Sequence, residues 1–370
     1  MRLLLCITRV RERVTLLFRI GRLAHSWGGT LAAITASLLL LMGAVGSVAA
    51  AETDWANVGG GARGYSGLYS VTINGATYDV TRGTDNNVWF RYNGNGWNPL
   101  GGDQATRTTS PPRIIEWPPG RAMVLVRGLD GEIWYSQVNS GSANLWAPWV
   151  RLPAGANAIG APLPTVVAGG LFIDAPNQYR QISVMNLYLR NGVVTPVGGW
   201  TVSSHAVLST NARDIEGDSQ IAVYGTERYE AVMRSFITGT DNHVWRITST
   251  ASGAVTGVTQ VDSGAVCESG VAAARQGNQN TVVGPGQSGY SEQQRVLIAC
   301  IGHDGYVWES LSSDGGLHFG PWTRPAGAPA PSQATPAINA TANSFNINIR
   351  WDGTRSGAFP DNSIVGKRIN

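Results

Sequence analysis

Short apolar runs rich in β-branched residues recur along the chain, and a turn signal follows each one. Val124–Val126, Phe236–Thr238 and Val296–Ala299 are examples, and a second apolar run opened by a Val-Trp or Ile-Trp pair comes after the turn. Two strand-like runs separated by Asp-Gly or Asp-Asn predict a β-hairpin, because the two turn residues must adopt positive φ and these residues do so at least cost. No helical periodicity is sustained after residue 51. The pattern predicts an all-β protein.

The turn signal is an internal repeat. The pattern G-x-D-[NG]-x-[VI]-W occupies residues 83–89, 128–134, 239–245 and 302–308, with a degenerate copy at Arg350-Trp351-Asp352-Gly353. A further segment follows the hairpin in several units, as at Trp97–Gly102, and predicts a fourth, outer strand. Four-stranded antiparallel units of this kind are typical of the blades of a β-propeller, which stack face to face.

The start of the predicted domain supplies the clue to how the ring closes. Trp55–Gly60 matches the outer strand at Trp97–Gly102, yet no blade precedes it. We expect this N-terminal strand to complete the last blade, whose inner strands lie near Phe345–Ile349, because such a closure removes exposed sheet edges. The predicted blades are residues 61–102, 103–155, 156–199, 200–264, 265–328, and 329–370 together with 52–60. Six blades in one domain, residues 52–370, are predicted, with seven blades as the alternative.

The first 51 residues have a different character. Six arginines come before a charge-free stretch, residues 28–51, which ends in the small residues Val48-Ala49-Ala50-Ala51. This order is typical of a signal peptide, so residues 1–51 are expected to be removed and the remainder to be secreted to the extracellular space or cell envelope. The alternative is an uncleaved membrane anchor, because the apolar run is about long enough to cross a bilayer.

Removing this segment reverses the sign of the net charge. Residues 52–370 hold 21 basic and 23 acidic residues, whereas the whole chain carries a net charge of +3. A nucleic-acid partner is therefore not expected, because such proteins normally present a basic face. Cys267 and Cys300 are the cysteines that remain after residue 51, and an even pair in an exported chain predicts a disulfide bond.

Few residues point to catalysis. The repeat aspartates occupy positions where a short side chain caps the turn, so we expect them to be structural rather than acid–base groups; they are Asp85, Asp130, Asp241 and Asp304. The histidines after residue 51 lack metal-ligand spacing, and the chain has no serine-nucleophile or phosphate-binding motif. No catalytic residue, metal or cofactor is predicted.

The tryptophans divide into two groups. Those inside the repeats are expected to wedge between neighbouring blades; they are Trp89, Trp134, Trp245 and Trp308. Trp97, Trp149 and Trp322 lie near turns at the rim, where a ring either packs or stacks on the apolar face of a sugar.

Two segments resemble known propeller families. Residues 312–319, SSDGGLHF, resemble the Asp-box of sialidase-like propellers, a turn device distant from the active site, but no sialidase arginine cluster or nucleophile is recognisable. The pattern from Arg82 through Trp89 to Gly102 resembles the repeat of secreted bacterial propeller lectins, the Photorhabdus-type and fungal fucose-lectin group. That resemblance covers the hairpins of four blades, whereas unit three, residues 165–200, has lost the G-x-D turn.

The lectin resemblance implies a function. Sugars would be held between adjacent blades by an aromatic face and by polar side chains such as arginine, at several weak sites that act together. The expected ligand-binding residues are Trp97, Trp149, Trp322, Arg82 and Arg127. The prediction is a non-enzymatic, exported carbohydrate-binding or adhesion protein whose partners are glycans or cell-surface polysaccharide. The alternatives are a propeller glycoside hydrolase with a degenerate signature and a protein-interaction propeller of the cell envelope.

Overall fold

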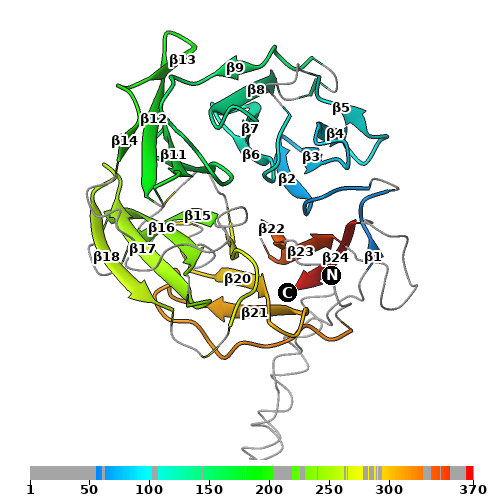
Figure 1. Ribbon diagram of the computed structural model, residues 1–370, viewed down its shortest axis with the longest axis vertical. Coiled ribbons are helices and arrows are strands. Elements are labelled where there is room, and N and C mark those ends of the chain that lie inside the picture. Colours follow the sequence, from blue (N-terminus) through cyan, green and yellow to red (C-terminus); the bar gives the residue numbers. More distant parts are fainter. Residues whose placement is uncertain are drawn as a thin grey trace, which may run out of the picture. The chain divides into compact units, whose positions relative to one another are not determined.

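The described part of the chain is a ring of small antiparallel sheets. The computed structural model describes residues 56–369 except for 61–62, 102–106, 140, 143–144, 180, 203–218, 226–229, 240, 262–263, 265, 278–281, 283–286, 289, 291–293, 328–334, 342 and 351–363. The elements of this part are strands, and they form six sheets arranged around a centre (Figure 1). The prediction of an all-β, six-bladed propeller is confirmed.

Blades one to three follow one another along the chain, and each runs from its innermost to its outermost strand. Blade one contains β2 (Tyr69–Ile73), β3 (Ala76–Arg82), β4 (Val88–Tyr92) and β5 (Asn98–Pro99). Blade two contains β6 (Arg113–Glu116), β7 (Arg121–Arg127), β8 (Ile133–Asn139) and β9 (Val150–Arg151). Blade three contains β10 (Leu163–Val167), β11 (Gly170–Pro176), β12 (Ile182–Arg190), β13 (Val193–Pro196) and β14 (Thr201–Val202).

Blades four and five continue this order, and blade six combines the two ends of the domain. Blade four contains β15 (Ser219–Gly225), β16 (Glu230–Thr238), β17 (Val244–Thr250) and β18 (Val255–Gln260). Blade five contains β19 (Ala272–Arg275), β20 (Val296–Ile301) and β21 (Val307–Ser312). Blade six contains β22 (Ala337–Ala340), β23 (Phe345–Arg350), β24 (Ile364–Ile369) and β1 (Ala56–Asn57).

Two blades depart from the predicted four strands. In blade three, β13 and β14 both pair with β12, so this blade continues past its predicted boundary at residue 199. In blade five the outer strand is reduced to a bridge in which Glu309 and Thr323 exchange both backbone hydrogen bonds. Trp322 and Pro325 flank this bridge, and a proline has no N–H with which to extend a ladder.

Apolar side chains cover both faces of the blades. All residues of β11 and of β20 are buried. One buried cluster joins blades two and three and another joins blades five and six, for example through Leu297 and Ile347. Packing on both faces explains why these strands are nearly continuous apolar runs rather than alternating ones.

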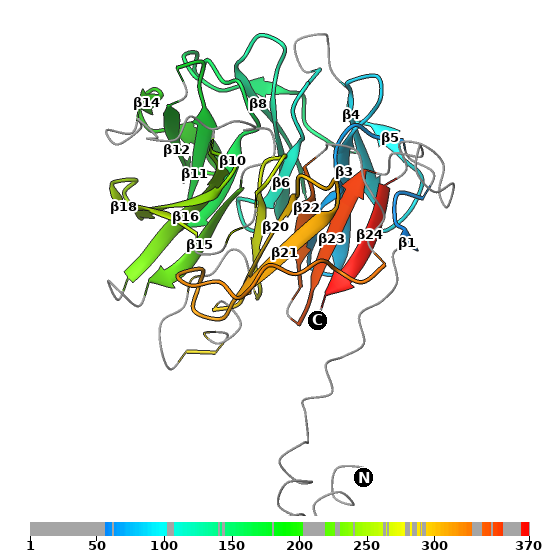
Figure 2. The same cartoon turned by 60° about the horizontal axis from the view of Figure 1, so that its bottom comes forward.

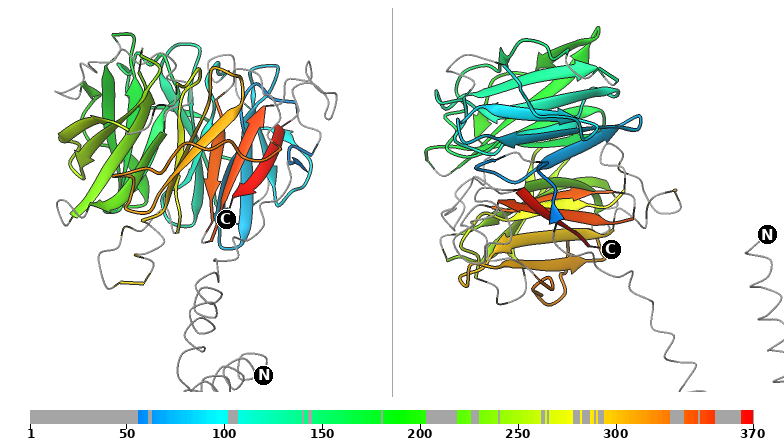
Figure 3. Two further views of the ribbon diagram at one scale, coloured as in Figure 1. Left: turned by 90° about the horizontal axis from the view of Figure 1, so that it is seen from below. Right: turned by 90° about the vertical axis from the view of Figure 1, so that its right-hand side faces the viewer.

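The first described strand closes the ring. Ala56 pairs with Gly366 and Asn57 with Val365, so β1 lies on the outer side of β24 (Figure 2 and Figure 3). The predicted closure of the last blade by the N-terminal strand is confirmed. Trp55, from which that prediction began, lies outside the described residues, as do residues 1–51 and residues 351–353 of the degenerate repeat.

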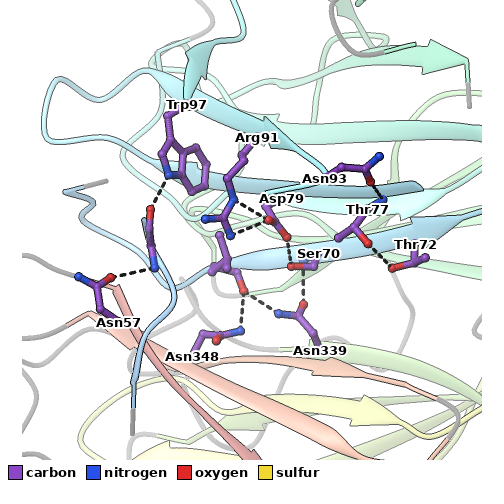
Figure 4. A network of polar contacts seen from close by, with 12 residues as sticks. Asn57, Ser70, Thr72, Thr77, Asp79, Arg91, Asn93, Trp97, Asn339 and Asn348 are labelled. Carbon is purple, nitrogen blue, oxygen red and sulfur yellow. Dashed lines mark hydrogen bonds and ion pairs between the residues drawn. The ribbon is translucent and has the colours of Figure 1, made fainter. Parts of the chain in front are cut away.

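Polar groups tie blade six to blade one (Figure 4). Nδ2 of Asn339, on β22, donates to the carbonyl of Leu68 at 2.8 Å, and its Oδ1 accepts from the backbone N–H of Ser70 at 2.8 Å. The hydroxyl of Ser70 donates to Asp79, whose carboxylate is 2.7 Å from Nη2 of Arg91. These bonds form a chain of contacts from the last blade into the first.

Among the described residues, no helix is long and apolar enough to cross a membrane.

Candidate functional site

Four turns of the repeat share one hydrogen-bond arrangement. The carboxylate of Asp85 accepts from the backbone N–H of Asn87 at 3.0 Å and from Nε1 of Trp89 at 3.1 Å. Partial burial alone would raise the pKa of Asp85, but hydrogen bonds from Asn87 and Trp89 outweigh it and lower the pKa. The corresponding pairs in blades two, four and five are Asp130–Trp134, Asp241–Trp245 and Asp304–Trp308. The capping role predicted for the four aspartates is confirmed.

In blades one and five, the indole explains the first glycine of the pattern. A Cβ placed on Gly83 would lie 2.6 Å from Nε1 of Trp89, and one placed on Gly302 would lie 2.6 Å from Cδ1 of Trp308. Only glycine leaves room for a ring at that distance. The glycine, the aspartate and the tryptophan therefore form one unit.

These turns have one residue with positive φ rather than two. The N–H of Asn86 bonds to the carbonyl of Gly83, and the N–H of Gly83 bonds to the carbonyl of Asn87. The loop therefore has three residues, and φ is +63° at Asn86, whereas Asp85 is not among the residues with positive φ. The prediction of two positive-φ turn residues is wrong, because a type I turn needs negative φ at both central positions and only the residue after them is left-handed.

Blade three keeps the turn with different chemistry. Oδ1 of Asn177, which stands at the glycine position, accepts from the backbone N–H of Tyr179 at 2.9 Å and of Gln181 at 3.0 Å. Its Nδ2 donates to the hydroxyl of Ser183, which stands at the tryptophan position, at 3.1 Å. Because a serine replaces the indole, a side chain fits where the other blades need glycine.

The turns of blades one, two and four contact the segment that leads into the next blade. The N–H of Ala158 donates to the carbonyl of Gly131, and the N–H of Cys267 donates to the carbonyl of Asn242. In blades one, three and five the lead-in segment pairs with the turn of its own blade, as Ala158 does with Asn177. Turns and lead-in segments therefore alternate along one side of the propeller, which we call the turn face. We call the boundary between two neighbouring blades on this face a seam.

The three predicted rim tryptophans lie at outer edges and are half-buried. Nε1 of Trp97 donates to the carbonyl of Gly59 at 2.5 Å, and Nε1 of Trp149 donates to the carbonyl of Gly101 at 2.7 Å. Trp322 packs against the apolar cluster shared by blades four and five. These contacts connect one blade to another, which favours rim packing over sugar stacking for these rings.

Trp200 makes the same kind of contact in blade three and was missed from the sequence. Its Nε1 donates to the carbonyl of Pro153 at 2.7 Å. The predicted blade ended at Gly199, before Trp200 and β14, although a Gly-Gly pair directly before a tryptophan marked the position.

The two predicted arginines end the second strands of their blades. Nε of Arg127 donates to the carbonyl of Ala158 at 2.7 Å, and its Nη1 donates to the hydroxyl of Thr109 at 2.8 Å. Arg127 therefore connects blades two and three. The guanidinium carbon of Arg82 lies 5.6 Å from the centroid of the Tyr65 ring.

A second arginine approaches that same ring. Arg350 ends β23 in blade six, and its guanidinium carbon lies 5.3 Å from the centroid of Tyr65. Tyr65, Arg82 and Arg350 are all half-buried. They lie at the seam between blades six and one, and we call these three residues the arginine seam. The sequence reasoning missed Tyr65 and Arg350. The signal for Arg350 was its place at the start of the degenerate repeat copy; in the structure it ends the second strand of its blade, as Arg82 and Arg127 do.

Other parts of the turn face have different chemistry. Near blades two and three, Leu129, Ile159 and Tyr179 are 51%, 37% and 70% exposed. At blade five, Nδ1 of His303 lies 2.7 Å from Oε1 of Glu268. The seams are therefore not copies of one site.

The Asp-box-like segment is a turn device. The carboxylate of Asp314 accepts from the hydroxyl of Ser312 at 2.7 Å and from the N–H of His318 at 3.0 Å. Arg246 of blade four donates to the carbonyl of Gly316 at 2.8 Å, which attaches this loop to the neighbouring blade. In the part of the chain that the structure describes, no group of three or more His, Cys, Asp or Glu residues is placed to hold a metal ion.

Comparisons with known proteins show the fold. No protein-family model and no curated protein sequence matches the chain. The structure of the SapL1 lectin in complex with alpha methyl fucoside has a TM-score of 0.52 at 11% identity, over 85% of this chain and 96% of that chain. AofleA from Arthrobotrys oligospora gives 0.51 at 8%, over 80% and 81%. The BP39L lectin from Burkholderia pseudomallei gives 0.50 at 14%, over 78% and 93%.

Proposed function

We propose that the propeller binds carbohydrate without turning it over, and that its principal site is the arginine seam. The observation that carries this proposal is the convergence of Arg82 and Arg350 on the ring of Tyr65 at the junction of blades one and six. A guanidinium group has five N–H donors in a fixed plane, which suits the hydroxyl oxygens of a sugar. An aromatic ring supplies an apolar surface beside them.

The similar folds support this proposal. SapL1 and BP39L are lectins, and the SapL1 structure contains alpha methyl fucoside. The seams differ from one another, so we propose one dominant site rather than a set of equivalent ones. Avidity from equivalent sites on one copy is then not expected.

The turn geometry argues against a hydrolase. Glycoside hydrolysis normally uses a pair of carboxyl groups on either side of the scissile bond. Each of the four repeat aspartates is instead bonded to the turn of its own blade, as Asp130 is to Glu132 and Trp134. Trp97, Trp149 and Trp322 remain candidate contacts, but as residues that hold the blade edges rather than as the main sugar platform.

Binding and turnover can be tested side by side. A glycan array and a panel of chromogenic glycosides are to be run with the full chain and with Arg350→Gln. We expect the full chain to bind glycans and to cleave no glycoside, and we expect Arg350→Gln to lose most of the binding. Arg324→Gln, which removes a guanidinium from another tyrosine ring, that of Tyr306, is the control and should keep its glycan profile. Release of chromophore from any glycoside would refute the proposal.

We further propose that the protein is exported and that residues 1–51 are removed as a signal peptide. The disulfide between Cys267 and Cys300 supports an oxidising compartment. The N-terminal sequence of protein recovered from the medium is the test. A start near Glu52 is expected, and an intact N-terminus held in the membrane would show an anchor instead.

A further inference from the structure

We propose that the arginine seam selects saccharides that carry a carboxylate, such as uronic acid residues, over their neutral counterparts. This inference rests on the proposed carbohydrate-binding function and names the class of ligand for the same site. The observation behind it is the presence of two permanently charged side chains on one ring, where a neutral sugar needs only hydrogen-bond donors.

The first step is the charge of the group. Arg82 and Arg350 come from different blades, and their guanidinium carbons lie 5.6 and 5.3 Å from the centroid of Tyr65. Arginine stays protonated throughout the physiological range, so the two groups repel one another. The negative face of the tyrosine ring offsets part of this repulsion. An anion bound near both groups would offset more.

The second step is the state of Arg350. Its Nε is buried and has no hydrogen-bond acceptor, and among the described residues no carboxylate forms an ion pair with it. Within the described part of the chain, its guanidinium group lies against the ring of Tyr65. A buried donor without an acceptor costs free energy, and a ligand oxygen that approached Nε would recover it. A carboxylate also matches the planar fork of a guanidinium group in two parallel hydrogen bonds.

The third step is the contrast with the neighbouring arginine. Arg127 occupies the same position in blade two and is also a cation, but its Nε donates to the carbonyl of Ala158 and its Nη1 to the hydroxyl of Thr109. The arginine seam instead combines two arginines at one ring, in a domain with slightly more acidic than basic residues. A local attraction of this kind favours a small anionic group over a polyanion such as nucleic acid, which needs a broad basic surface.

The experiment compares three probes by titration calorimetry with the full chain. The probes are tetragalacturonic acid, its neutral methyl ester, and a sulfated neutral tetrasaccharide. At an ionic strength of about 0.01 M, where the Debye length is about 30 Å, we expect the acid to bind at least about tenfold more tightly than the ester, which corresponds to one strong charge-assisted contact. The advantage should shrink at about 1 M salt, where that length is about 3 Å.

Variants assign the effect to the seam. Arg350→Gln should remove the preference for the acid and bind acid and ester alike, whereas Arg350→Lys should keep part of the preference. Arg324→Gln is the matched control, because Arg324 also lies over a tyrosine ring, that of Tyr306 at 3.2 Å, on another blade. Thermal unfolding of each variant checks that the fold is retained. Arg350→Lys keeps the positive charge and Arg350→Gln removes it, so their comparison separates the effect of charge from that of packing.

Each outcome bears on one proposal. Equal affinity of the full chain for acid and ester would overturn the preference for a carboxylate while leaving carbohydrate binding intact. Tighter binding of the sulfated probe than of the acid would overturn the choice of carboxylate in the same way. A loss of preference in Arg324→Gln as large as in Arg350→Gln would place the site elsewhere. Failure of every probe, together with an empty glycan array, would refute the proposed function itself.

Discussion

The tryptophan of each repeat determines which residue can stand six positions before it. In blades one and five the indole lies against the Cα of a glycine. In blade three a serine, Ser183, stands at the tryptophan position, and an asparagine, Asn177, stands at the glycine position. The glycine is therefore needed for space and not for an unusual backbone conformation, since Gly83 and Gly302 are not among the glycines with positive φ.

We expect Gly83→Ala to lower the free energy of unfolding by about 1–3 kcal/mol, the usual cost of overpacking. The added methyl group would lie 2.5 Å from Oδ1 of Asp85 and 2.6 Å from the indole of Trp89. Urea unfolding followed by tryptophan fluorescence measures the change. Gly96→Ala is the control, because a Cβ on Gly96 would meet no atom within 4 Å. Equal effects of the two variants would contradict the steric explanation.

Blade three offers a second check of the same idea. If the indole is the obstacle, adding Trp89→Ser should make Gly83→Asn less harmful, because Asn177 and Ser183 already form this combination. The double variant should then cost less than the two single changes added together, which is the signature of directly coupled residues. Strict additivity would show that the glycine is required for another reason.

At the scale of elements, the hairpins could be predicted from sequence more securely than their turns. Apolar runs around Asp-Asn or Asp-Gly specified β3 with β4 and β7 with β8, and both pairs are present. The turn subtype could not be predicted, because two-residue and three-residue loops use the same residue types. The turn of blade three was also not recognisable, because an asparagine side chain at the glycine position replaces the aspartate cap.

The disulfide bond joins the lead-in segment of blade five, at Cys267, to strand β20 of the same blade, at Cys300. Cys267 and Cys300 are fully buried, and the bond closes a separation of 33 residues. We expect the oxidised chain to exceed the reduced chain in free energy of unfolding by about 3–4 kcal/mol, as the chain-entropy model gives for a loop of this length. Paired urea titrations with and without reductant measure this difference without altering any side chain. Identical midpoints would mean that bonds such as Cys267 N–H to Asn242 hold the segment alone.

At the scale of the whole molecule, the number of blades and the closure of the ring could be predicted, whereas only Arg82 of the arginine seam could. Recurring outer strands marked the blade boundaries, and an unmatched first strand indicated closure. Tyr65 and Arg350 come from opposite ends of the domain, and only the closed ring places them together. The rim tryptophans bond or pack across blade boundaries, which could not be read from the sequence, and their part in sugar binding stays a prediction.

Ring closure should be measurable as stability. A chain that begins at Arg63 lacks β1 and loses the bond from Trp97 to Gly59. It leaves the edge of β24 exposed, a feature that promotes aggregation. We expect its melting temperature to fall by several degrees relative to a chain that begins at Glu52, measured by scanning calorimetry. An unchanged melting temperature would show that the polar contacts around Asn339 suffice to close the ring.

The placement of β1 beside β24 also sets the order in which the protein is completed. Synthesis proceeds from the N-terminus, so β1 is made well before its partner β24, Ile364–Ile369. Until β24 is made, the blades form an open ring with an unpaired strand at one end. A product that ends before Ile364 would stay open and exposed to proteases. An affinity tag fused directly after Asn370 would lie close to the pairing of β1 with β24. A tag at that position therefore needs a spacer.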